Sequence, residues 1–153
     1  MIEVTFPDGT KKSFSKGITP IGIAKTISQG LARNIISADF NGKTVETNSQ
    51  IFDCGKIKFY TWKDNEGKKA FWHSSAHVLA QALEDLYSNI KLTIGPAINN
   101  GFYYDVDFGE HVFSEKDFPK VEKRMLEICK GKHLFKLKPI SKTDALNHYK
   151  NQK

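Results

Sequence analysis

Two histidines four residues apart, His73 and His77, have the spacing in this sequence that best suits chemistry. On a helix, residues with this spacing lie on one face about one turn apart, so both imidazoles can reach one atom or one water molecule. A neutral imidazole can ligate a metal ion. With a pKa near ~6.5 it can instead take a proton from water while its neighbour orients that water. The spacing also occurs in helices that only pack or face solvent, so it leaves these roles open.

The nearby sequence argues against a metal at this pair. A metalloprotease helix carries a glutamate directly after its first histidine, where this chain has Ser74. Cys54 and Cys129 lie far from each other and from the histidines in the sequence, so neither is at the spacing of a third ligand. We therefore expect no bound metal and two ordinary reduced thiols.

A second group of chemically capable residues follows downstream. Asp105 and Asp107 would share one face of a strand, where they could hold a cation or divide acid and base roles. A polar outer face explains them equally well, because apolar residues alternate with them. Tyr103 and Tyr104 could stack on a nucleobase, although aromatic residues on strands more often pack in a core.

The first sixty residues predict a small α+β unit. Alternating apolar residues on both sides of a turn at 7–10 predict a hairpin. Thr19–Pro20 predicts the start of a helix, which we expect to end just before Gly30. Further strands are expected within 35–40 and 57–61. A hairpin, one helix and more strands follow the order of a β-grasp sheet.

A polar segment then divides the chain. Residues 63–69 contain no apolar side chain and one glycine. We interpret 63–70 as a linker between a first domain at 1–62 and a second at 71–153. A solvated loop inside one domain is the alternative. In the second domain we predict a helix from about residue 71 to 87, a half-buried strand, and two further helices, so that the whole chain is α+β.

The composition is that of a soluble globular protein: 153 residues, 39% hydrophobic and 26% charged. No apolar run approaches the ~20 residues of a membrane span, and no secretion signal is visible, so we expect a cytoplasmic location. The net charge of +6 arises entirely within 130–153, where seven lysines accompany a single acid, Asp144. This favours a polyanionic partner only weakly, because Arg33 and Arg124 are the only arginines.

Two stretches carry a resemblance to a known family. They are His73-Ser-Ser-Ala-His77-Val-Leu-Ala80 and Leu92-Thr-Ile-Gly-Pro-Ala-Ile-Asn-Asn-Gly-Phe-Tyr-Tyr-Asp105. Together they resemble the amino-terminal half of bacterial threonyl-tRNA synthetases. The similarity covers the whole chain: a TGS domain of β-grasp fold over 1–62, then the first part of the tRNA-editing domain over 71–153. The histidine motif alone also occurs in alanyl-tRNA synthetase editing domains, whereas its combination with residues 94–105 is specific.

The resemblance implies a parent enzyme that joins threonine to tRNA(Thr) with ATP and magnesium. Its class II core, a catalytic zinc and an anticodon-binding domain would lie beyond residue 153, and we expect it to dimerise through that core. We expect no cofactor in this chain itself.

The resemblance also implies an editing role for named residues. The family's editing domain hydrolyses serine wrongly esterified to tRNA(Thr), and it does so without a bound metal. His73 and His77 match the first editing motif and are the implied catalytic residues, and Tyr104 falls in a segment that lines the substrate pocket. The second motif, Cys-x-x-x-His, has no counterpart here, so we expect little or no hydrolysis by this chain alone.

Two alternatives remain open. TGS units also occur in GTPases and alarmone synthetases as regulatory or RNA-contacting parts, so the chain could be a non-catalytic RNA-binding module. That hypothesis predicts binding by residues 1–62 without help from His73 or His77. A freestanding trans-editing protein with zinc at the two histidines is the other alternative, and a metal analysis would distinguish it.

Overall fold

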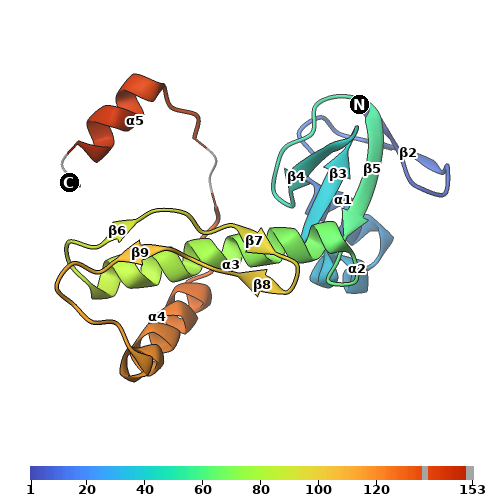
Figure 1. Cartoon of the computed structure of the whole chain (residues 1–153). Coiled ribbons are helices and arrows are strands. Elements are labelled where there is room, and N and C mark those ends of the chain that lie inside the picture. Colours follow the sequence, from blue (N-terminus) through green and yellow to red (C-terminus); the bar gives the residue numbers. More distant parts are fainter. Residues whose placement is uncertain (136–137, 151–153) are drawn as a thin grey trace. The chain divides into compact units, whose positions relative to one another are not determined.

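A computed structural model describes residues 1–135 and 138–150 of the chain. The chain folds as two compact units, Met1–Trp72 and His73–Lys153 (Figure 1). The remaining residues, 136–137 and 151–153, belong to the part predicted as the second domain and lie outside the described residues. No helix within the described residues has both the length and the apolar character that crossing a bilayer requires.

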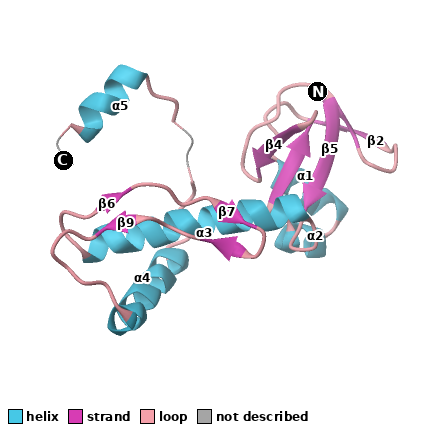
Figure 2. Cartoon of the chain, viewed as in Figure 1, coloured by secondary structure: helices cyan, strands magenta, loops and turns pink. Residues whose placement is uncertain are grey.

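The first unit is built on a mixed five-stranded sheet (Figure 2). Its strands, in chain order, are β1 (Ile2–Thr5), β2 (Lys11–Phe14), β3 (Ser37–Phe40), β4 (Lys43–Glu46) and β5 (Gly55–Tyr60). They lie in the order β2-β1-β5-β3-β4, with β1 and β5 parallel and every other neighbouring pair antiparallel. A hairpin at each edge and a parallel pair in the middle form the predicted β-grasp sheet.

Turn residues explain both hairpins. Gly9 has a φ of +85° in the first turn, a conformation that glycine adopts without strain. In the second turn Asn41 and Gly42 have φ values of 54° and 80°, as a two-residue hairpin loop requires. The carboxylate of Asp39 accepts a hydrogen bond from the Gly42 N–H at 2.9 Å, which holds that turn.

The predicted helix of this unit is two short helices, α1 (Pro20–Ile27) and α2 (Gln29–Asn34). Thr19 caps α1 as predicted, its hydroxyl accepting from the Gly22 N–H at 3.1 Å. The predicted end at Gly30 is wrong because Ser28 is extended and stops α1 first. The Ser28 hydroxyl then accepts from the Leu31 N–H at 3.0 Å, so Ser28 also caps α2, which contains Gly30.

The core of the first unit lies between these helices and the sheet. Ile23 and Ala24 of α1 are fully buried together with Val4 of β1 and Ile57 of β5. The apolar alternation along β1 and β5 therefore supplies one face of the core, as the sequence pattern predicts.

The long helix α3 (Asn65–Leu86) begins about six residues earlier than predicted. Residues 65–70 of the predicted linker are thus helical. The Asp64 carboxylate accepts from the N–H and the hydroxyl of Thr61 at 2.8 and 3.0 Å, and the Lys68 N–H donates to the Asp64 carbonyl at 3.0 Å. Gly67 has no Cβ to overlap the Thr61 carbonyl oxygen. These contacts hold the start of α3, which an apolar pattern does not reveal because the first residues of the helix are polar. The division into domains at 62 and 71 stays a prediction.

The second unit surrounds the later part of α3 with short strands and helices. Strands β6 (Lys91–Leu92) and β9 (Val106–Asp107) pair antiparallel, as do β7 (Ala97–Ile98) and β8 (Gly101–Phe102). A 3-10 turn, η1 (Glu115–Asp117), leads into α4 (Phe118–Lys130), and α5 (Lys142–Tyr149) follows. Figure 1 shows α4 beside α3, and the buried side chains of both helices form this unit's core: Ala82, Leu83, Val121 and Ile128.

The predicted half-buried strand is shorter than expected but keeps its alternation. Only Val106–Asp107 pairs as a strand, yet Tyr104, Val106 and Phe108 are half-buried while Tyr103, Asp105 and Asp107 are exposed. The polar residues therefore form an outer face.

Candidate functional site

The imidazoles of His73 and His77 contact each other on one face of α3. Their Nε2 atoms are 3.1 Å apart, their ring centroids 4.6 Å apart, and the ring planes meet at 84°. Two nitrogen lone pairs, or two N–H groups, would repel at this distance. One Nε2 therefore carries a hydrogen and donates a hydrogen bond to the other Nε2. The pair thus has a donor and an acceptor side by side.

Electrostatics favour the neutral form of His77. Partial burial lowers the pKa of its imidazole, and the nearby His73 lowers that pKa further by charge repulsion. A neutral ring keeps a nitrogen lone pair at neutral pH, as a ligand or a general base requires.

The histidine pair opens onto a pocket of about 460 Å³ within the second unit. This volume lies within the range of small-molecule sites, ~300–1,000 Å³. Ala76 of α3 also lines this pocket, and the other walls come from distant segments: Thr93, Ile94, Gly95, Pro96, Ala97 and Tyr104. The structure therefore brings all three predicted site residues, His73, His77 and Tyr104, to one cavity.

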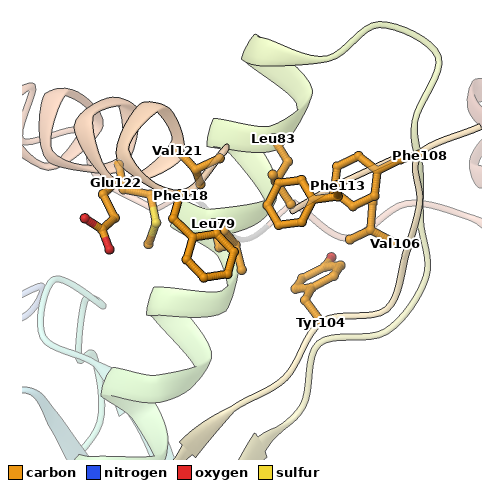
Figure 3. Close-up of a pocket in the computed structure, with 10 residues that line it drawn as sticks. Leu79, Leu83, Tyr104, Val106, Phe108, Phe113, Phe118, Val121 and Glu122 are labelled. Atoms are coloured by element: carbon orange, nitrogen blue, oxygen red, sulfur yellow. The ribbon is translucent and has the colours of Figure 1, made fainter. Parts of the chain in front are cut away.

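Tyr104 also lines a second, adjoining pocket of about 340 Å³. Figure 3 shows Tyr104 at the edge of that pocket, on the segment that also carries Val106 and Phe108. The remaining walls come mostly from apolar side chains of α3 and α4, and Glu122 is the one charged side chain among the described residues that line it. Burial, followed by the nearby Glu84, raises the pKa of the Tyr104 phenol, so this hydroxyl stays protonated and can donate.

The other candidates from the sequence lie outside the histidine pocket. Asp105 and Asp107 are exposed and line neither cavity, and the Asp107 carboxylate accepts from the Gly109 N–H at 2.8 Å. Cys54 and Cys129 are exposed free thiols. Within residues 1–135 and 138–150, no three His, Cys, Asp or Glu side chains gather as a metal site would require.

Sequence reasoning did not identify one wall of the pocket and one neighbour of His77. The wall at 93–97 lies within a stretch quoted above, but its Gly95–Pro96 pair reads locally as the end of a strand. The ring of Phe135 lies 6.1 Å from that of His77, between centroids. No local pattern links Phe135 to α3, so only the folded chain shows this contact.

Comparisons with known proteins agree with this architecture. The TGS domain family matches residues 2–61. Over 99% of its length, the chain is 58% identical to the threonine--tRNA ligase of Flavobacterium psychrophilum and 58% identical to that of Flavobacterium johnsoniae. It is 50% identical over 97% of its length to the threonine--tRNA ligase of Cytophaga hutchinsonii. The chain spans about 23% of the length of each of these relatives.

Proposed function

Because this chain carries a TGS domain and is homologous to the amino-terminal region of threonine--tRNA ligases, we propose that its second unit is part of an editing site. The substrate would be tRNA(Thr) wrongly charged with serine, and the reaction would be hydrolysis of the ester. The observation that carries the proposal is the histidine pair, a donor and an acceptor 3.1 Å apart, at the wall of a pocket.

The whole protein would be a threonine--tRNA ligase, with ATP, magnesium and tRNA(Thr) as its partners in the reaction. Most of the relatives' length is not covered by this chain. We assign the ATP site, a catalytic zinc and a dimer interface to that remainder, and a cytoplasmic location to the whole protein.

A physical limit on selectivity explains why such a site is needed. Serine differs from threonine by one missing methyl group, and a pocket discriminates one such group by only ~1–3 kcal/mol. A ligase that must be more accurate than this requires a second site. That site rejects threonine by size and destroys the serine ester.

The histidine pair has the groups that ester hydrolysis requires. A water molecule that replaces the direct bond between the rings would donate to the Nε2 lone pair of one and accept from the Nε2–H of the other. Neutral His77, whose pKa is lowered, is the candidate base for this water. The protonated phenol of Tyr104 lines the same pocket and is the candidate contact to the aminoacyl group.

Hydrolysis of Ser-tRNA(Thr) tests the proposal directly. We expect a longer protein, extended to the length of the relatives, to release serine rapidly, and this chain alone to release little. His73→Ala and His77→Ala should each abolish release in the longer protein. His133→Ala is the matched control, because His133 is exposed and lines neither pocket. Unchanged release in both histidine variants would remove the pair from the mechanism.

A second function, RNA contact by the first unit, is favoured by an exposed pair of rings. Trp62 and Phe71 are 47% and 42% exposed, and their ring centroids are 5.0 Å apart at 85°. Four lysines flank them in the sequence, a combination that suits stacking on single-stranded bases: Lys58, Lys63, Lys68 and Lys69. Trp62→Ala in the whole chain should weaken tRNA binding measured by fluorescence anisotropy, and equal binding would count against this function.

A further inference from the structure

The geometry points to Gly95 as a positioning residue that sets the size of the histidine pocket through the ring of Tyr104. The inference rests on the proposed editing function, in which the size of the pocket selects the serine ester over the threonine ester. It concerns a residue that the histidine motif does not include and that carries no reactive group.

The contact between the two residues leaves no room for a side chain on residue 95. A Cβ atom added to Gly95 would overlap Cδ2 and Cε2 of the Tyr104 ring and would lie 3.0 Å from Cγ. Cγ is the ring atom bonded to Cβ, so it moves only when the whole side chain rotates. Any residue other than glycine must therefore displace the ring.

The backbone is paired on both sides of the contact, by hydrogen bonds between 93–94 and 105 and by the β7–β8 pair, and this pairing limits relief of the overlap by the backbone. The Thr93 N–H and hydroxyl both donate to the Asp105 carbonyl, at 3.1 and 2.8 Å. The Asp105 N–H donates to the Ile94 carbonyl at 3.0 Å. Gly95 directly follows Ile94, and Tyr104 directly precedes Asp105 on the facing segment. An aromatic ring packed over a glycine on the neighbouring strand is a recurrent stabilising arrangement in sheets.

Displacement of the ring would change the pocket itself. Among the described residues, Tyr104 alone lines both the 460 Å³ histidine pocket and the 340 Å³ apolar pocket. Figure 3 shows it at the edge of the apolar one. If the ring leaves, the histidine pocket gains space towards the apolar side chains. A site that rejects threonine by size would then accept the extra methyl group.

A double-mutant cycle in the longer protein tests this role. We expect Gly95→Ala to reduce the preference for Ser-tRNA(Thr) over Thr-tRNA(Thr), measured as the ratio of kcat/KM values, by roughly 10-fold or more, since small misplacements at a site cost up to ~100-fold. Tyr104→Ala should shift the ratio in the same direction. In the Tyr104→Ala background, Gly95→Ala should add nothing, because there is no ring to displace. Independent, additive effects would overturn the inference.

Gly30→Ala is the matched control for the glycine substitution. A Cβ there has only the Ser28 hydroxyl within 4 Å, at 3.8 Å, and Gly30 lies in the first unit. This variant should retain the discrimination ratio. An equal loss in Gly30→Ala would show that the effect of Gly95→Ala is not specific to the pocket.

A structural measurement on this chain separates the inference from the proposed function. By NMR, the Gly95 α protons should show a ring-current shift and nuclear Overhauser contacts with the Tyr104 ring, and both should vanish in Tyr104→Ala. Absence of these contacts in the unmodified chain would overturn the inference. If the contacts are present but no variant hydrolyses Ser-tRNA(Thr), the editing proposal fails while the positioning of Tyr104 by Gly95 is supported.

Discussion

The Nε2 atoms of His73 and His77 lie 3.1 Å apart across one turn of α3. At this distance the rings share one hydrogen bond, in which one Nε2 donates and the other accepts. Burial, and then the neighbouring His73, disfavour the cationic form of the His77 imidazole and lower its pKa. The position of His77 on α3 therefore affects its titration.

The titration of His77 supplies the first prediction. Its pKa should lie below the ordinary ~6.5, because burial and then His73 disfavour the cation. His73→Gln should raise the pKa only part of the way back, since burial is the larger cause. An NMR titration of the imidazole protons measures both values. A pKa of His77 above 6.5 would contradict the assigned environment.

The same shift has a consequence for stability. A histidine whose pKa is lowered by folding binds its proton more readily in the unfolded chain. The free energy of unfolding should therefore decrease as the pH falls below about 6.5, where the unfolded chain begins to take up the proton. His77→Gln should weaken this dependence in denaturant titrations between neutral and mildly acidic pH, and an unchanged dependence would contradict the lowered pKa of His77.

Gly67 should be indispensable to the start of α3. Alanine is favoured over glycine in a helix by ~1 kcal/mol, but a Cβ at this position would overlap the Thr61 carbonyl oxygen. Overpacking against backbone costs about 1–3 kcal/mol, so Gly67→Ala should destabilise the first unit on balance. Gly30→Ala, with open space around its Cβ, should be neutral or stabilising. Urea midpoints of the two variants measure the contrast, and equal midpoints would contradict the packing at Thr61.

Ser28 should matter more than an exposed serine usually does. Its hydroxyl caps α2 through the Leu31 N–H, and its own N–H donates to the Ala24 carbonyl at the end of α1. Ser28→Ala should reduce the free energy of unfolding by about 1 kcal/mol, the usual effect of losing an N-cap. Ser28→Asp should retain most of the stability, because its carboxylate can also accept from a helix N-terminus. If alanine and aspartate behaved alike, the cap would contribute nothing.

Tyr87 should ionise at a higher pH than an ordinary tyrosine. Burial, and then its hydrogen bond to the Asp117 carboxylate at 2.8 Å, raise the pKa of this phenol to about 12. In an alkaline absorbance titration, Tyr87→Phe should therefore remove a component that ionises near pH 12. Loss of a component near the ordinary tyrosine pKa of about 10 instead would contradict the bond to Asp117.

Much of the local structure followed from the sequence alone. The turn at Asn41 and Gly42, the cap at Thr19 and the alternation of β1 and β5 are decided by neighbouring residues, and the structure has them as predicted. The common face of His73 and His77 is equally local, because a helix places residues four apart one turn from each other. The helix boundaries at Ser28 and Asn65 were not predicted, because a cap shared by two helices and the polar first residues of α3 leave no periodic signal.

The sequence by itself thus determined the α+β character and the common face of the histidines, which depend on residues close in the chain. The order of its elements also predicted the β-grasp sheet, although the central β1–β5 pair joins Val4 to Gly55. Only the tertiary structure decided that residues 93–97 and Tyr104 line a pocket with those histidines. It also decided that the Tyr104 ring occupies the space that a Cβ on residue 95 would need. Those contacts join segments separated by other elements. Their geometry depends on strand register and side-chain packing, which hydrophobic patterns do not encode.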